Sequence, residues 1–142
     1  MKKFLKAMLA AMLIAITAVT VCSCGVPSDP AKAKENLKKN GYTPDETIAT
    51  AVIKSVTTLE YGISFFDKVE SSLWAVNADG ETVLIVYCKD SDSAKKVNKI
   101  SKSIYDKVKE KDKENDTKTD IKSGMSGKVV YIGTKAGVKA AN

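Results

Sequence analysis

Apolar and polar positions separate a leading uncharged stretch from a longer part of the 142-residue chain in which the two kinds alternate. Lys2, Lys3 and Lys6 precede an uncharged run from Ala7 to Val21, which small residues follow as Ser23-Cys24-Gly25. A positive beginning, an apolar middle and a zone of small residues are the three parts of an export signal. The run is shorter than the roughly 20 residues of a membrane-spanning helix, so the pattern favours a cleaved signal peptide over an uncleaved anchor.

The clearest amphipathic pattern after this signal lies between Asp90 and Lys109. Its apolar residues recur every three or four positions, as on one face of a helix: Ala94, Val97, Ile100, Ile104 and Val108. Asp90 and Asp92 supply side-chain oxygens for the N-terminal cap. Residues 109–120 alternate charges without an apolar residue, which predicts a frayed helix end followed by a loop.

Two apolar runs predict a β-hairpin in the middle of the chain. Residues 73–76 and 82–87 flank Asn77-Ala78-Asp79-Gly80, and Asp-Gly between apolar runs is a strong hairpin signal. The second run is apolar at almost every position. It is therefore predicted to be a central strand that is covered on both faces.

A second hairpin and two helices complete the clearer elements. A strand beginning at Ile121, a turn at 124–127 and a strand over 128–132 form the predicted hairpin. Residues 31–39 read as a helix that ends before Asn-Gly, and residues 135–141 as a terminal helical turn.

Residues 43–61 carry conflicting signals. Thr43-Pro44-Asp45-Glu46 has the form of a capping box, and Ile48, Val52 and Val56 fall at helical spacing. The segment is also dense in β-branched residues, and its Ile-Thr-Val positions fit a two-residue period. The pattern favours a strand, with a helix as the alternative. The next residues, 62–69, are expected to form a loop or helical turn whose aromatic residues pack on the core.

Together these elements predict an α+β fold, an antiparallel β-sheet of about four to five strands with helices packed on one face. The predicted organisation is a signal peptide over residues 1–23, a lipidated cysteine and short linker over residues 24–30, and a single domain over residues 31–142. A domain of this length buries about two-thirds of its unfolded surface, which is enough for an independent core.

Composition narrows the classes of function. After the signal, 20 lysines stand against 17 acidic residues, a net charge of +3 that is ordinary for a secreted domain. The chain has no arginine, the residue most used to contact bases, and its predicted export argues further against nucleic acid as a partner. It has no histidine, the usual general base near neutral pH and the commonest metal ligand. We expect no catalytic residues, no cofactor and no metal site.

Several side chains are candidates for chemistry, but each has a simpler structural interpretation. Cys88 ends the predicted central strand without a histidine beside it, so a core cysteine is expected. Asp90 and Asp92 lack the rest of a calcium loop and are better explained as helix caps. The charged run around Asp112 is expected to be a solvated loop. The aromatic residues are candidates for a ligand groove but are more simply explained as core residues: Tyr42, Tyr61, Phe65, Phe66 and Trp74.

The residues Val21-Cys22-Ser23-Cys24 resemble the lipobox of bacterial lipoproteins. In that family an aliphatic residue and, two positions later, a small residue precede the cysteine that receives the lipid. The resemblance therefore implies lipidation of Cys24, with palmitate-type acyl chains. The register that ends at Cys22 places the bulky Val21 before the cysteine and fits less well. Ordinary cleavage nearby, with free cysteines, is the alternative.

Short motifs downstream are similar to those of small uncharacterised lipoproteins of Gram-positive, clostridia-like bacteria: Asn40-Gly41-Tyr42, Tyr87-Cys88-Lys89-Asp90 and Val130-Tyr131-Ile132-Gly133-Thr134-Lys135. The resemblance implies a lipid-anchored protein on the extracytoplasmic face of the cell membrane and no known activity. We expect a non-enzymatic binding or interaction module whose partners are the membrane, through its lipid, and an envelope protein or anionic polymer. A structural or assembly role is the alternative, and an enzyme is the less favoured one.

The predicted helix after Asp90 also carries a set of lysines outside its apolar face: Lys95, Lys96, Lys99, Lys102 and Lys107. A short linker would hold this set close to an anionic envelope, where each lysine at the surface contributes about 1 kcal/mol. The sequence predicts contact with lipid head groups or anionic wall polymer, with a merely solvated helix face as the alternative.

Overall fold

The computed structural model describes residues 25–142, so the predicted signal peptide and Cys24 lie outside the described residues. The elements in chain order are α2 (Pro30–Lys39), β1 (Thr43–Asp45), α3 (Glu46–Tyr61), the 3₁₀ helix η1 (Ile63–Lys68), β2 (Val69–Val76), β3 (Thr82–Cys88), α4 (Ser91–Glu114), β4 (Ile121–Ser126), β5 (Val129–Thr134) and α5 (Lys135–Ala141).

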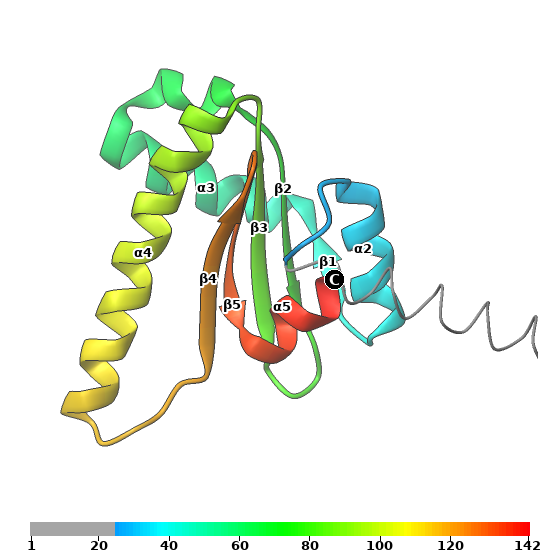
Figure 1. Cartoon of the computed structure of the whole chain (residues 1–142), viewed down its shortest axis with the longest axis vertical. Helices are drawn as coiled ribbons and strands as arrows, with labels where there is room; N and C mark the ends of the chain where they lie inside the picture. The colour runs from blue at the N-terminus through cyan, green and yellow to red at the C-terminus, as the bar shows by residue number, and fades with distance from the viewer. Residues whose placement is uncertain (1–24) are drawn as a thin grey trace, which may run out of the picture.

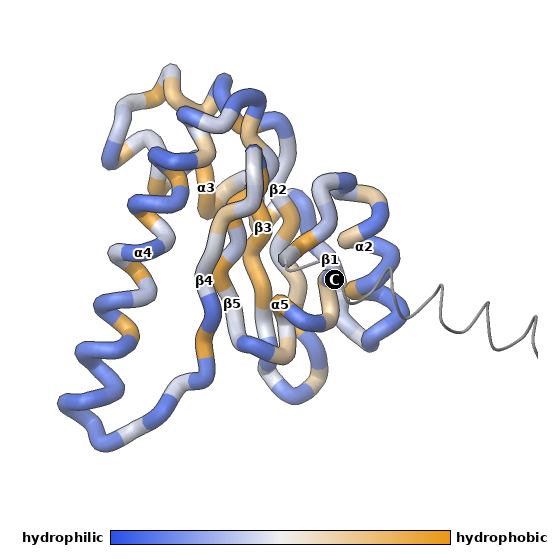
Figure 2. Tube along the Cα trace, in the orientation of Figure 1, coloured by the Kyte–Doolittle hydropathy of each residue, from blue (hydrophilic) through white to orange (hydrophobic). Residues whose placement is uncertain are grey.

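The five strands form one antiparallel sheet in the order β1-β2-β3-β5-β4 (Figure 1). The predicted α+β class is confirmed. The hairpin at Asp79-Gly80 joins β2 to β3, and β3 lies at the centre, as its apolar sequence predicts. Figure 2 shows hydrophobic residues concentrated along the inner strands, whereas α4 is largely hydrophilic.

The helices cover both faces of the sheet, whereas the sequence predicts helices on one face. Val83, Ile85 and Tyr87 of β3 pack with α2 and α5, and Val86 and Cys88 pack with α3 and α4. Successive side chains of a strand point to opposite faces, so an apolar run needs cover on both. The sequence also predicts that the central strand is covered on both faces, and the structure agrees with that prediction. The predicted single layer of helices is the part that is wrong.

Residues 43–61 are mostly helical, so the preferred strand is wrong except for β1. The Asp45 carboxylate accepts a hydrogen bond from the Ile48 amide at 2.8 Å and caps α3. Ile53 and Thr57 are buried on one side of the helix. The Thr57 hydroxyl donates to the Ile53 carbonyl at 2.7 Å, which satisfies it within the helix. Packing and the cap thus outweigh the β-branched composition.

The second hairpin differs in its turn. β4 runs through Gly124 and Met125, which the sequence assigns to the turn, and the chain reverses at Gly127-Lys128. Gly124 lies opposite Tyr131 in the register, and a Cβ at this position would overlap the Tyr131 hydroxyl. Gly124 is therefore a close-approach position within a strand.

The predicted linker packs on the domain instead of extending from it. Val26 is 5% exposed and belongs to the core shared by α2, α5 and the sheet. The Tyr87 hydroxyl donates to the Pro27 carbonyl at 3.1 Å. A Cβ at Gly25 would lie 3.8 Å from Tyr131 Cε1. The chain is thus held against the sheet from its first described residue.

Candidate functional site

A groove lies between α3 and α4, over the centre of the sheet. α3 packs mainly on β2, and α4 packs on β4 and β5, so β3 is left between the two helices. Leu84 of β3 and Ile132 of β5 are register partners on this face. Both are only partly buried, although the neighbouring Val83 and Ile85 are fully buried. The sheet therefore has an incompletely covered strip at its middle.

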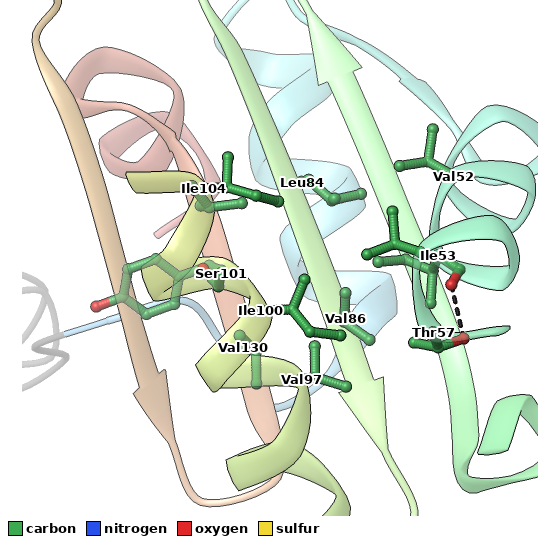
Figure 3. Close-up of a pocket in the computed structure, with 13 residues that line it drawn as sticks. Val52, Ile53, Thr57, Leu84, Val86, Val97, Ile100, Ser101, Ile104 and Val130 are labelled. Carbon is green, nitrogen blue, oxygen red and sulfur yellow. Dashed lines mark hydrogen bonds between the residues drawn. The ribbon is translucent and has the colours of Figure 1, made fainter. Parts of the chain in front are cut away.

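Side chains from both helices and two strands line this shallow groove, whose cavity volume is about 40 Å³ (Figure 3). The floor comes from β3 and β5, and the walls come from α3 and α4. The wall residues are Val52, Ile53, Val56 and Thr57 on α3, and Val97, Ile100, Ser101 and Ile104 on α4. The apolar lining is typical of a site for an apolar ligand, and the small volume means that such a ligand would lie along the groove and not be enclosed by it.

The polar side chains of the walls are already hydrogen-bonded within the protein. Thr57 donates its hydroxyl to a backbone carbonyl of its own helix. The Ser101 and Ser123 hydroxyls lie 2.8 Å apart and bond to each other, which ties α4 to β4. Both hydroxyls thus already have a hydrogen-bond partner within the protein. The groove therefore offers an apolar surface and no converging polar atoms.

At one end of the groove, a hydrogen bond and stacked side chains bridge the two helices. The Tyr61 hydroxyl, at the end of α3, donates to the Lys96 carbonyl of α4 at 3.1 Å. The Tyr61 and Phe65 rings lie 4.9 Å apart, and Lys96 Nζ lies 5.7 Å and 5.8 Å from their centroids. This bridge joins the helices beyond Thr57 and Val97.

The other end is open. Figure 3 shows Val52 and Ile104 toward this end on opposite walls of the groove, with Leu84 between them and Thr57 and Val97 farther along. Val52 is 40% exposed and Ile104 is 41% exposed. Lys107 and Lys111 follow Ile104 by three and seven positions, which places them on the same side of α4. Positive charge therefore lies beside the open end.

The five lysines predicted for anionic contact are all exposed, but they do not form one uniform face. Lys96 lies over the aromatic bridge, and Lys95 pairs with Asp92 at 3.5 Å. Helical spacing puts Lys99 and Lys102 with Lys95 on the outer side of α4, and Lys107 toward the groove. The set therefore divides between the outer surface and the groove.

Cys88 is a buried free cysteine in the core between the sheet and the α3–α4 layer. Burial, and secondarily the charge of Asp90, raises the pKa of its thiol to about 11. The reactive form of cysteine is the thiolate, so this thiol is poorly suited to nucleophilic or redox chemistry at neutral pH. The core assignment made from the sequence fits this environment.

Two of the acidic side chains singled out in the sequence, Asp90 and Asp112, accept hydrogen bonds from backbone amides. Asp90 accepts a hydrogen bond from the Ser93 amide at 2.7 Å and caps α4, and hydrogen bonds from Ser93 lower the pKa of its carboxyl. Asp112, assigned by sequence to a solvated loop, is instead buried near the end of α4. In residues 25–142, no three His, Cys, Asp or Glu side chains are placed to hold a metal ion.

None of the five candidate aromatic residues lines the groove. Tyr42 and Phe65 are buried in the two cores, whereas Tyr61, Phe66 and Trp74 are partly buried. Sequence reasoning missed the groove because it favoured a strand where α3 lies. The helical spacing of Ile48, Val52 and Val56 was the signal that could have found one wall.

Comparison of the chain with models of protein families, with curated proteins and with solved structures gives no match in any of the three. Over the part of the chain that the structure describes, no helix combines the length and apolar character needed to cross a bilayer. The groove's geometry and the residues around it therefore carry the functional argument.

Proposed function

We propose that this chain is a lipid-anchored, extracytoplasmic binding module on which the tail of a single-chain anionic amphiphile lies along the groove between α3 and α4. The main observation that supports this proposal is that Leu84 and Ile132, at the centre of the sheet, are only partly buried. Apolar burial contributes roughly 25 cal/mol per Å², so a tail that covers this strip gains free energy. The anchor is the lipid proposed for Cys24.

The shape of the groove favours one apolar tail over a partner helix. The Tyr61–Lys96 bridge joins the two helices at one end, and a partner helix that runs the length of the groove would have to pass this bridge. A tail can enter from the open end beside Val52 and Ile104. Its head would then lie near Lys107 and Lys111, where positive charge favours a carboxylate or phosphate.

A binding role also suits the chemistry of the described residues better than catalysis does. The groove walls supply valine, isoleucine and leucine side chains, together with hydroxyls that are already hydrogen-bonded. A general acid or base needs a titratable group within hydrogen-bond reach of the substrate. We therefore propose binding without a chemical step. An envelope protein or anionic polymer is not the occupant proposed for this groove.

Photo-crosslinking tests the proposal with the full chain in host membranes. Cells are supplied with a long-chain fatty acid that carries a diazirine, irradiated, and the labelled peptides are mapped by mass spectrometry. We expect cross-links in the peptides of α3 and α4 that require light, unlike acylation at Cys24. Val52→Glu should reduce them about tenfold or more, because it places a carboxylate in an apolar wall.

Leu59→Glu is the matched control, since Leu59 lies on the same helix, is 89% exposed and does not line the groove. It should leave the cross-linking unchanged. Lys107→Glu should weaken the labelling more than Lys102→Glu does. Equal labelling of the Val52→Glu variant and the unsubstituted chain would show that the groove is not the binding site.

A further inference from the structure

We propose that the α2–α5 face, made by α2, α5 and residues 25–29, lies against the membrane, so that the α3–α4 groove opens on the far side of the sheet. This inference rests on the lipid anchor of the proposed function, but it does not depend on what the groove binds. Two independent observations carry it: where the chain enters the fold, and how charge is divided between the two helical layers.

The entry point of the chain is fixed on the α2–α5 side. Val26 is buried in the core that α2 and α5 share with the sheet, and Tyr87 donates its hydroxyl to the Pro27 carbonyl. Cys24 directly precedes Gly25, and neighbouring Cα atoms are about 3.8 Å apart. A lipid on Cys24 therefore leaves no spacer with which the domain could turn over freely.

The two helices of this face are tied to each other. The Asn36 side-chain amide donates to the Ala141 carbonyl, and the Asn40 amide donates to the Ala140 carbonyl, both at 3.2 Å. Figure 1 shows α2 and α5 next to each other, with α4 on the opposite side of the sheet. These bonds also satisfy carbonyls at the end of α5. The result is one continuous surface around the entry of the chain.

This surface is positive. It carries two acidic residues, Asp29 and Glu35, against six lysines, a net charge of +4: Lys32, Lys34, Lys38, Lys39, Lys135 and Lys139. Lys34, Lys39 and Lys135 pair with Glu46, Glu35 and Asp120. The ion pairs identified within residues 25–142 do not include Lys32, Lys38 or Lys139. These three lysines are therefore available to anionic head groups.

The outer lysines of α4 are placed less favourably for the same membrane. α4 carries eight lysines but also five acidic residues, so its net charge is only +3. It lies across the sheet from the entry of the chain, and electrostatic attraction falls off over a Debye length of about 8 Å at physiological salt. The net charge of the α2–α5 face is only slightly higher, and most lysines of α4 are also outside the identified ion pairs. The short tether at Gly25 is therefore the main reason to expect the membrane on the α2–α5 face and not at Lys95, Lys99 and Lys102.

Head-group quenching in vesicles tests this orientation with the full, lipidated chain. A fluorophore is attached at Lys38→Cys on α2 or at Lys99→Cys on α4, while the buried Cys88 is not expected to react. The vesicles contain anionic lipid and a small fraction of lipid with a quencher on its head group. We expect several-fold stronger quenching of the label on α2, and a smaller difference between the two labels at high salt.

Charge-reversal pairs supply the control. In the Lys38→Cys chain, Lys32→Glu with Lys139→Glu should reduce the quenching, whereas Lys95→Glu with Lys102→Glu should leave it unchanged. Equal quenching of the two labels, or stronger quenching on α4, would overturn the orientation while leaving the groove proposal intact. Failure of the chain to partition with membranes would overturn both the anchor and the orientation.

Discussion

Asp112 organises the connection between α4 and β4 at the scale of single residues. Its carboxylate accepts hydrogen bonds from the Thr119 amide at 2.8 Å, the Thr119 hydroxyl at 2.7 Å and the Thr117 hydroxyl at 3.1 Å. Lys109 Nζ lies 3.8 Å from the same carboxylate. The hydrogen bonds, led by those from Thr119, lower the pKa of Asp112. A segment that looks merely solvated in sequence thus has a fixed attachment.

We expect Asp112→Asn to loosen this loop, because the new amide cannot accept all of the hydrogen bonds that the carboxylate accepts. Hydrogen exchange at the Thr119 amide should become faster. Asp106→Asn, an exposed change on the same helix, should have no such effect. Unchanged exchange at Thr119 in the Asp112→Asn variant would contradict the role assigned to this carboxylate.

The lowered pKa of Asp112 predicts how the effect of Asp112→Asn depends on pH. A carboxyl whose pKa is lowered by folding stabilises the fold above its unfolded pKa, about 3.9 for Asp, and this contribution is lost as pH falls through the folded pKa. The difference in exchange between Asp112→Asn and the unsubstituted chain should therefore disappear at acidic pH.

At the scale of elements, β3 serves two different faces. Ile85 is fully buried beneath α2 and α5, whereas its neighbour Leu84 is partly exposed on the floor of the groove. One strand therefore contributes to a closed core with one side chain and to an open groove with the next. Alternation places the two side chains on opposite faces, and the separation of α3 from α4 leaves one of these faces less closed than the other.

A pair of alanine substitutions measures this difference. Ile85→Ala should lower the free energy of unfolding by about 2–5 kcal/mol, because it removes fully buried methylene groups. Leu84→Ala should cost about 1–2 kcal/mol, since part of that side chain already contacts solvent. Denaturant unfolding followed by the fluorescence of Trp74, the single tryptophan, gives both values. Equal losses would contradict the uncovered floor of the groove.

At the scale of the whole molecule, the three layers give the domain two distinct surfaces. One surface carries the entry of the chain and the excess of lysines on α2 and α5. The other carries the apolar groove. If Cys24 is the lipidated residue, we expect the first surface to face the membrane and the second surface to leave the groove accessible to a ligand.

The attachment itself has a direct test. In its host, the chain should fractionate with membranes, and Cys24→Ala should release it or leave the precursor unprocessed, because the acceptor of the lipid is gone. Immunoblots of membrane and soluble fractions give the outcome, with Cys88→Ala as the matched cysteine control. A Cys24→Ala chain that is processed and fractionates normally would rule out the lipobox interpretation.

Much of the fold is encoded in local patterns of the sequence. Asp79-Gly80 predicts the central hairpin, and the spacing of Ala94, Val97 and Ile100 predicts the face that α4 packs on the sheet. Turn chemistry, helix caps and helical periodicity act over a few residues, so they can be seen without knowledge of the rest of the chain. The absence of histidine and arginine is likewise a property of the sequence alone.

Only the tertiary structure decides between patterns that are locally balanced. The β-branched residues of α3 are compatible with a strand, and packing of Ile53 and Thr57 on the sheet makes them helical. The groove exists because α3 and α4 rest on different strands and leave Leu84 and Ile132 between them. Such a gap depends on contacts between residues far apart in the chain, so no local pattern contains it. The same physical reason, long-range packing, ties the predicted linker down at Val26.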